Sequence, residues 1–399
     1  MQLSQRARAM KPSSTLAVTA RLKALKAAGV DVIGFGAGEP DFDTPLHIRE
    51  AAKVALDQGK TRYEPTSGTP AARASIARYM NTRFGYNVGP ENVIISCGGK
   101  HALYLAFMAL VDPGDEVLLP APYWVSYPEQ ARLAGGVVRE IPTTAEHDFK
   151  MTPEQLEQAI GPKSRVLVIN SPCNPTGTMY TRAELAALGE VVARHPQLLV
   201  FSDDIYERLV YTDELFANIA MACPAVAPQT VTFNCLSKSY AMTGWRAGYT
   251  VASVDLIKAM DTLQGQMTSN ITSFVLAAIP AALDAPQDEI EAMRKTFAER
   301  AAYIHQRVVA LPGIVCPRPS GAFYVFPDIS ALVGRTSPGG KKITGAQAVA
   351  EALLEEALVA VVPGEDFGSD RHVRLSFATG MDDIRKGLDR IEKFLQQLT

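Results

Sequence analysis

Residues 234–248 have the sequence NCLSKSYAMTGWRAG and follow the apolar run VTF at 231–233. This order predicts a buried strand that ends in a polar loop. Lys238 lies in that loop between serines and small residues, where a solvated lysine is not expected. Ser237 offers a hydroxyl group and Arg246 a planar fork of donors, a pair that suits a phosphate dianion. The segment therefore predicts a lysine held beside a phosphate-binding site.

A lysine in such a setting indicates a particular chemistry. Burial and neighbouring cations lower the pKa of a lysine amine and make it nucleophilic, which suggests that Lys238 forms a Schiff base with pyridoxal 5′-phosphate (PLP). An isolated Ser-Lys pair is far more often part of a surface loop, but the complete pattern S-K-x-x-x-x-T-G-W-R-x-G is much more specific. It resembles the PLP-lysine segment of the class I aminotransferases, the aspartate aminotransferase family of fold type I.

Composition is that of an ordinary globular enzyme. The chain has 399 residues, of which 47% are hydrophobic and 20% charged. That length exceeds what one hydrophobic core supports, so about two domains are expected. The formal net charge of −3 gives no reason to expect a nucleic-acid partner. Apolar runs stay well short of the roughly 20 residues of a membrane-spanning helix, so no membrane association is expected.

The five cysteines are scattered, odd in number and without C-x-x-C spacing. This pattern predicts reduced thiols in a cytoplasmic protein, and neither a disulfide framework nor a metal site.

A second phosphate contact is predicted where an apolar strand meets a helix. Residues 92–96 have a strand pattern, and CGGK at 97–100 then opens an almost wholly apolar helix. Free N–H groups and the positive end of the helix dipole make such a turn a phosphate cradle. We expect the backbone amides of Gly99 and Lys100 to bind the cofactor phosphate.

Two adjacent acids, Asp203 and Asp204, follow the buried strand predicted at 198–201. A carboxylate at a buried strand end needs a cationic partner. A protonated pyridine nitrogen supplies one, and the ring in return stays an electron sink. The residues alone do not decide between the two acids. The D-x-x-Y spacing of the family selects Asp203, and it implies that Tyr206 reaches the phenolic oxygen of the cofactor.

Further roles follow from the resemblance alone. Trp124, after the P-x-P bend at 120–122, resembles the aromatic residue that stacks on the pyridine ring, and the family implies a cis peptide at Ala121–Pro122. Asn174, in the turn NPTG, resembles a donor to the phenolic oxygen. Trp124 and Asn174 are also expected to border the substrate. For the tryptophan, a plain core aromatic is the alternative interpretation.

The resemblance also implies how the substrate is held. Gly38, in GAGEP at 36–40, is expected to contact the substrate carboxylate. Arg374, in VRLSF at 373–377, is expected to bind the α-carboxylate with a bidentate fork, although a strand arginine is usually an exposed residue. Tyr63, in a Y-x-x-x-x-G pattern, resembles the loop residue that reaches the PLP phosphate of a partner subunit. A homodimer with shared active sites is therefore expected.

Strand patterns separated by helices predict an α/β fold with a mostly parallel central sheet and helices on both faces. This large PLP-binding domain is expected to span residues 46–290. A smaller α+β domain would comprise the C-terminal residues 291–399 and part of an N-terminal arm, residues 1–45.

The sequence leaves open which residue binds the distal carboxylate of the substrate. The segments GAGEPDFDTP, PAPYWVSYPE and AMTGWR resemble a bacterial subgroup that includes aspartate/prephenate aminotransferases. The region around 264–270 has no arginine, whereas animal and enterobacterial aspartate aminotransferases use one there to bind the distal carboxylate. Buried carboxylates need a cation or several donors. The candidates are Lys11, Lys100 and Arg318.

The predicted reaction moves an amino group between L-aspartate or glutamate and 2-oxoglutarate or oxaloacetate, with prephenate as a further candidate. A broad aromatic or alanine-type aminotransferase is the alternative within the family. A PLP-dependent C–S β-lyase and a non-catalytic PLP-binding regulatory domain are the alternatives from other classes.

Overall fold

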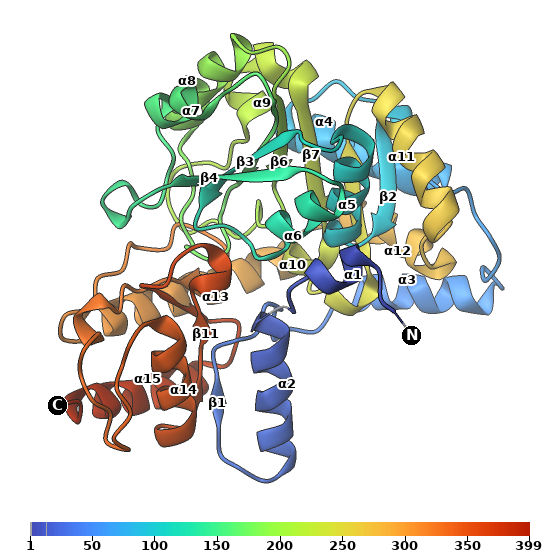
Figure 1. The fold of residues 1–399 in the computed structure, drawn as a ribbon. Coiled ribbons are helices and arrows are strands. Elements are labelled where there is room, and N and C mark those ends of the chain that lie inside the picture. The colour runs from blue at the N-terminus through green and yellow to red at the C-terminus, as the bar shows by residue number, and fades with distance from the viewer. Residues whose placement is uncertain (1, 13) are drawn as a thin grey trace.

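The structure, a computed structural model, describes residues 2–12 and 14–399. In this part of the chain, seven strands form a central sheet in the order β2–β8–β7–β6–β5–β3–β4 (Figure 1). Neighbours from β7 to β4 pair in parallel, and β8 runs antiparallel to both β7 and β2. The expected mostly parallel sheet is confirmed. Its strands are β2 (Val93–Cys97), β3 (Glu116–Ala121), β4 (Val137–Pro142), β5 (Ser164–Asn170), β6 (Leu199–Asp203), β7 (Thr230–Cys235) and β8 (Ala247–Val251).

Helices cover both faces of this sheet. On one face, Val117 and Leu119 of β3 pack in a core with α5 (Gly99–Leu110), α6 (Ser126–Leu133) and α11 (Val254–Met267). Leu118 points to the other face, because successive strand residues alternate in direction. That second face is covered by α3 (Leu46–Asp57), α4 (Pro70–Phe84), α7 (Pro153–Ala159), α8 (Arg182–Ala193), α9 (Ile219–Ala222) and α12 (Ser273–Asp284).

A smaller α+β body lies beside the sheet and combines both ends of the chain (Figure 1). It contains a two-stranded parallel pair, β1–β10, and a three-stranded antiparallel sheet in the order β11–β12–β9. The strands are β1 (Ile33–Gly34), β9 (Tyr324–Val325), β10 (Val359–Ala360), β11 (Val362–Pro363) and β12 (Val373–Ser376). The N-terminal and smaller-body helices are α1 (Gln5–Ala9), α2 (Ser14–Ala27), α13 (Asp288–Val309), α14 (Ala346–Glu356) and α15 (Met381–Gln396).

Helix α13 joins the two bodies. Ile290 in its first turn belongs to the core under the sheet, whereas Phe297 belongs to the core of the smaller body. Tyr206 and Leu209, which follow β6, also pack into the smaller body's core. The domain limits at 45/46 and 290/291 remain predictions.

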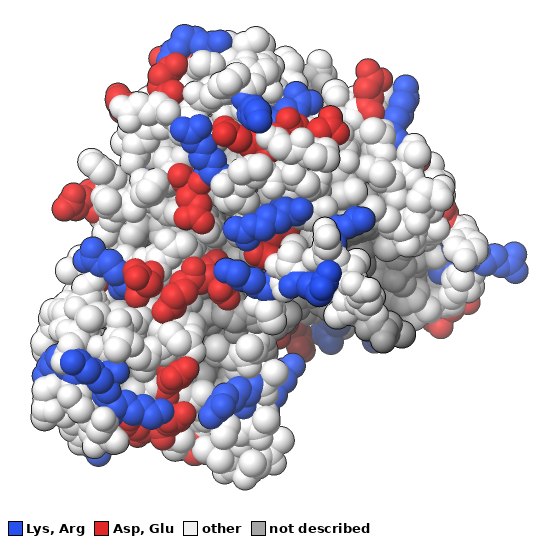
Figure 2. All heavy atoms as spheres, in the orientation of Figure 1, with Lys and Arg blue, Asp and Glu red and all other residues white. Residues whose placement is uncertain are grey.

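Surface charge is mixed. On the face drawn in Figure 2, acidic and basic side chains are interspersed over both bodies. Among the described residues, helices are too short or too polar to cross a bilayer.

The strand directions bring several loops to one edge of the sheet. The carboxyl ends of β2, β3, β5, β6 and β7 meet there because these strands are parallel to one another. The antiparallel β8 presents its amino end at the same edge, so Arg246, just before β8, joins them. Ligands of open α/β sheets bind at this edge.

Candidate active site

A cavity of about 440 Å³ lies at this edge, between the sheet and the smaller body. It brings together most of the residues singled out in the sequence: Gly38, Gly99, Lys100, Trp124, Asn174, Asp203, Tyr206, Ser237, Lys238, Arg246 and Arg374. These residues come from eight separate segments of the chain. The cavity is therefore a site assembled by the fold.

Lys238 projects into the cavity from α10 (Leu236–Ser239), the single helical turn after β7. Its ammonium group donates a hydrogen bond to the carbonyl oxygen of Gly38, which belongs to the N-terminal segment. Enclosure lowers the pKa of Lys238, and the charges of Arg374 and Arg246 lower it further. A lysine with a lowered pKa is a better nucleophile and base near neutral pH.

Glycines shape the phosphate end of the cavity. Gly98, with φ of +80°, is the N-cap of α5, so the next amides lie at a helix N-terminus without intrahelical acceptors. Gly248 of β8 packs directly on this turn: a Cβ there would lie 2.4 Å from the Gly98 carbonyl carbon and 2.4 Å from the Gly99 nitrogen. Backbone can approach this closely only because glycine lies on both sides of the contact, in β8 and in the turn that opens α5.

Arg246 closes the same end. It adopts a left-handed conformation (φ 58°), and its guanidinium donates to the carbonyl oxygens of Thr243 at 2.9 Å and Cys97 at 3.3 Å. A Cβ on Gly98 would lie 2.4 Å from Nη2 of Arg246, so the guanidinium rests against the glycine turn. Ser237, the residue before Lys238, is buried and also lines the cavity.

Asp203, at the end of β6, is 1% exposed and lines the cavity. It accepts hydrogen bonds from the Tyr127 hydroxyl at 2.5 Å and the Ile205 amide at 3.4 Å. Burial raises the pKa of Asp203 to about 6. The adjacent Asp204 accepts bonds from Ser202 and Asn218, both at 2.7 Å, and does not line the cavity.

Arg374, on β12, is almost fully buried and holds the opposite side of the cavity. Its guanidinium donates to Asn174 Oδ1 at 2.9 Å and to the Gly36 carbonyl oxygen at 3.0 Å. Burial lowers the pKa of Arg374. Its Nε is buried without a partner in the described structure. A buried donor without an acceptor is costly, so a carboxylate is the expected ligand.

Trp124 is half-buried at the wall of the cavity. Its ring meets Tyr127 edge to face, with centroids 5.3 Å apart. The ammonium of Lys100 lies 5.0 Å from the indole centroid. Enclosure and the charge of Arg246 lower the pKa of Lys100. The Ala121–Pro122 peptide before Trp124 is cis, as expected, and the Ser171–Pro172 and Asn174–Pro175 peptides are cis as well.

Several cavity residues were not singled out in the sequence. Tyr324 of β9 places its hydroxyl 3.0 Å from the Tyr206 hydroxyl, and Tyr127 bonds Asp203. Lys23 and Thr19 of α2 line the mouth. Tyr127 belongs to the quoted PYWVSY segment, but no residue pattern marked its hydroxyl as a partner of the acid. Thr19, Lys23 and Tyr324 lie in segments whose residue patterns carry no such signal.

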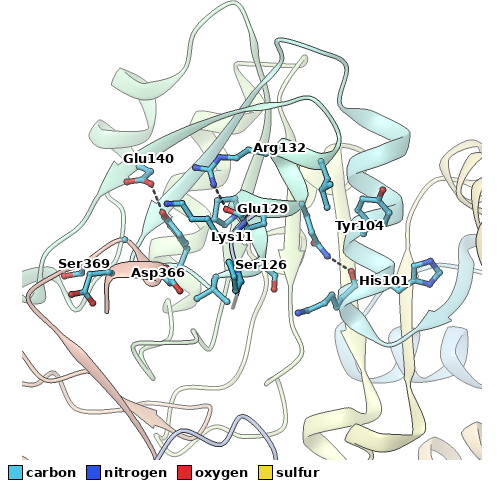
Figure 3. A pocket seen from close by; sticks show the side chains of 18 of the residues that line it. Lys11, His101, Tyr104, Ser126, Glu129, Arg132, Glu140, Asp366 and Ser369 are labelled. Carbon is cyan, nitrogen blue, oxygen red and sulfur yellow. Dashed lines mark hydrogen bonds and ion pairs between the residues drawn. The ribbon is translucent and has the colours of Figure 1, made fainter. Parts of the chain in front are cut away.

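Three predicted site residues lie outside this cavity. Lys11 lines a neighbouring cavity of about 950 Å³, where its backbone amide donates to Glu129 and where Arg132 lies nearby (Figure 3). The two cavities share Lys100 in their linings. Arg318 is exposed and lines neither of them.

Tyr63 is 91% exposed in the single chain. Its loop is tied to the segment after α11, because the Glu64 amide donates to Asn270 at 3.2 Å and Ser273 donates to the Arg62 carbonyl at 2.5 Å. Its expected contact with a partner subunit remains a prediction.

The residues present fit PLP. The glycine turn and Arg246 suit its phosphate, and the buried Asp203, whose second oxygen accepts only a long bond, suits a protonated ring nitrogen. Lys238 suits its aldehyde carbon and Arg374, with its unpartnered Nε, suits the carboxylate of an amino acid. This donor set is that of a lysine-centred cofactor cavity in an α/β enzyme.

Comparisons with known proteins agree with this arrangement. A family model for aminotransferase class I and II matches residues 30–391, and the chain belongs to that family. An aspartate/prephenate aminotransferase of Cereibacter sphaeroides is 48% identical over 98% of both chains. An aspartate aminotransferase of Bacillus subtilis is 46% identical over 100% of both.

Solved structures show the same fold. The crystal structure of the aspartate aminotransferase from Rhizobium meliloti has a TM-score of 0.96 at 38% identity and covers 100% of both chains. The Thermus thermophilus aspartate aminotransferase with maleate has a TM-score of 0.92 at 42% identity, over 99% of this chain and 100% of that one.

Substitution of Gly248 tests the glycine contact. Gly248→Ala places a Cβ against backbone that cannot move aside, so we expect PLP affinity to fall at least tenfold and stability to fall by about 1–3 kcal/mol. Gly244→Ala is the matched control, because a Cβ at Gly244 meets nothing within 4 Å. PLP titration measures the affinity of each variant, and urea unfolding measures its stability. Wild-type affinity in Gly248→Ala would contradict the proposed cradle.

The raised pKa of Asp203 predicts an unusual dependence of the protein's stability on pH. Its pKa rises from an ordinary 3.8 to about 6 on folding, so its ionised form destabilises the folded cofactor-free chain above pH 6. This penalty disappears as the pH falls toward 4. Asp203→Asn should therefore be more stable than the wild type at pH 8, by about 2–3 kcal/mol, with a difference that vanishes at low pH.

Denaturant unfolding of the cofactor-free proteins at several pH values measures this difference. The exposed Asp213→Asn serves as control and is expected to leave the pH dependence of stability unchanged. An Asp203→Asn protein that is less stable than the wild type at pH 8 would show that the buried carboxylate has a stabilising partner.

Proposed function

We propose that this chain is a PLP-dependent aminotransferase that transfers the amino group between L-aspartate or glutamate and 2-oxoglutarate or oxaloacetate, with prephenate as a further acceptor. The observation that carries the proposal is the joint placement of Lys238, Asp203 and Arg374 in one cavity. The relatives named aspartate and aspartate/prephenate aminotransferase support the choice of substrates.

Bound PLP would supply an electron sink for the electrons released when the substrate loses its α-proton. Asp203 would hold the ring nitrogen in its protonated form through its charge. Tyr127 keeps that carboxylate in place by its hydrogen bond at 2.5 Å. Asn174 and Tyr206 would donate to the phenolic oxygen, and Trp124 would stack on the ring.

Lys238 is the group that moves the proton. Its amine would hold the cofactor, and when free it would accept the substrate's α-proton and later give it back. Burial lowers the pKa of Lys238 and so favours the unprotonated amine, which is the form that accepts a proton.

Arg374 orients the substrate. Its fork would bind the α-carboxylate, and the bonds to Asn174 and the Gly36 carbonyl fix its plane. A substrate held this way presents its α-proton, and not its carboxylate, for cleavage. Positioning of this kind selects transamination over decarboxylation.

We also propose a cytoplasmic homodimer whose large domain spans residues 46–290. The five cysteines are free in the described structure, which suits a reducing compartment. Exposed Tyr63 lies in the loop tied to the segment after α11, and Met267 at the end of α11 is also exposed. Large exposed apolar side chains on adjacent loops suit a subunit interface.

A half-reaction screen tests the proposed substrates. PLP-loaded protein is mixed with aspartate, glutamate, alanine, phenylalanine, arogenate or cystathionine without an acceptor, and the loss of the cofactor's visible absorbance is followed. Rapid change with aspartate and glutamate is expected. Change mainly with phenylalanine or alanine would overturn the substrate assignment, and release of pyruvate and ammonia from cystathionine would indicate a lyase.

Removal of the lysine amine tests the proposed chemistry. Lys238→Ala should lower aspartate turnover by at least about 10²–10⁴-fold, the usual contribution of a positioned general base. Lys150→Ala, which breaks an ion pair with Glu184 away from the cavity, is the control and should retain activity. Full turnover in Lys238→Ala would refute the proposed function.

Of the candidates for binding the distal carboxylate of the substrate, Lys100 lines the cavity of Lys238. Lys11 lines the neighbouring cavity. Lys100→Ala should raise KM for aspartate about tenfold relative to alanine, as expected for the loss of a bond to a charged group. Lys11→Ala should have a smaller effect. Equal losses for aspartate and alanine in Lys100→Ala would refute this role.

A further inference from the structure

Tyr324 is a buried residue of the cavity that the reaction described above does not use. It lies on β9 of the smaller body and is 1% exposed. Its hydroxyl is 3.0 Å from the hydroxyl of Tyr206, and its ring centroid is 4.5 Å from the guanidinium carbon of Arg374. One side chain therefore touches both the group proposed for the phenolic oxygen and the group proposed for the substrate carboxylate.

The strand register explains this double contact. β9 and β12 are antiparallel, and Tyr324 pairs with Ser376. Arg374 lies two residues before Ser376 on β12, so its side chain leaves the same face of the sheet as that of Tyr324. Diagonal neighbours across two strands are within reach of long and aromatic side chains. The sheet itself fixes the ring beneath the guanidinium.

Either hydroxyl can be the donor in the hydrogen bond between Tyr206 and Tyr324. Each is buried, and within the described residues each has the other as its hydrogen-bond partner. A buried hydroxyl proton requires an acceptor. If Tyr324 donates to the Tyr206 oxygen, the Tyr206 proton remains available to a ligand in the cavity.

We propose that Tyr324 is a positioning residue that donates its proton to Tyr206 and so directs the Tyr206 proton to the phenolic oxygen of the cofactor, while its ring supports Arg374. This inference rests on the proposed function and deepens it. A donor that itself accepts a hydrogen bond is polarised and becomes a stronger donor. A cation over an aromatic face is attracted to the ring, most strongly where water is excluded.

The neighbourhood of Tyr324 agrees with this role. Burial raises the pKa of Tyr324, opposed by the charge of Arg374, so the hydroxyl stays protonated at physiological pH. A Cβ on Gly38 would lie 3.4 Å from the Tyr324 hydroxyl, so the N-terminal segment closes over it. The same Gly38 accepts the hydrogen bond of Lys238.

Substitution by phenylalanine tests the hydroxyl alone. Tyr324→Phe keeps the ring and removes the donor, so the bound cofactor's phenolic oxygen should be less well stabilised in its ionised form. The pH midpoint of the cofactor's visible absorbance should therefore rise by about half to one pH unit, the shift that one lost hydrogen bond can produce. The aspartate kcat/KM should fall several-fold.

A double-mutant cycle on the PLP-loaded enzyme shows whether Tyr324 acts through Tyr206. Tyr206→Phe should raise the same midpoint at least as much, and the double variant should not exceed Tyr206→Phe alone. Additive shifts, or an unchanged midpoint in Tyr324→Phe, would overturn the inference. The absorbance titration needs no turnover, so it remains decisive even if the wild type fails to transaminate aspartate and the proposed function falls.

Two further variants separate positioning from folding. Tyr211→Phe removes another buried hydroxyl, which donates to the Ala322 carbonyl and lies outside the cavity. It should lower stability without moving the pH midpoint. Tyr324→Leu removes the ring and should raise KM for aspartate and alanine alike, whereas Tyr324→Phe should not. An equal midpoint shift in Tyr211→Phe, or an unchanged KM in Tyr324→Leu, would contradict the assignment.

Discussion

A close backbone contact at one edge of the sheet organises the site. Gly248, at the beginning of the antiparallel strand β8, packs on the Gly98–Gly99 peptide at a separation that leaves no room for a side chain. Through this contact, the loop before β8 and the first turn of α5 face the same space. Because β7 is the neighbour of β8, the loop after β7 delivers Lys238 to that space as well. Phosphate-binding groups and the reactive amine are thus positioned by one pairing of strands.

The cavity gathers several cationic side chains. Lys238, Arg246, Arg374 and Lys100 line it, and the buried Asp203 faces them. Like charges and enclosure lower the pKa values of Lys238 and Lys100, because both disfavour the protonated form. A phosphate and a carboxylate relieve this repulsion together. Asp203 lies buried at the end of β6, where Lys238 is near enough to lower its pKa but donates no hydrogen bond to it in the described structure.

Residues at strand ends could be predicted from the sequence, because an apolar run followed by a polar residue already places that residue at the edge of the sheet. Lys238 was found in this way, and so was the pair Asp203 and Asp204, from which only the resemblance to the family selected Asp203. Tyr324 could not be found in this way, since AFYVF at 322–326 predicts a short strand without indicating which ring faces a cavity. Lys11 is one of three candidates for the distal carboxylate, and the hydrogen bond of its backbone amide to Glu129, distant in the sequence, places it in the adjoining cavity. Such contacts depend on tertiary packing that local patterns do not encode.

The two bodies contribute different parts of the cavity. Lys238, Asp203 and Arg246 belong to the edge of the large sheet, whereas Gly38, Tyr324 and Arg374 come from segments associated with the smaller body. Natural selection can therefore act on the two halves separately. Changes in the smaller body and in α2 can alter which amino acids are accepted, while the sheet edge that performs the chemistry stays the same. An architecture of this kind allows one ancestral catalyst to diversify into several activities without rebuilding its reactive centre.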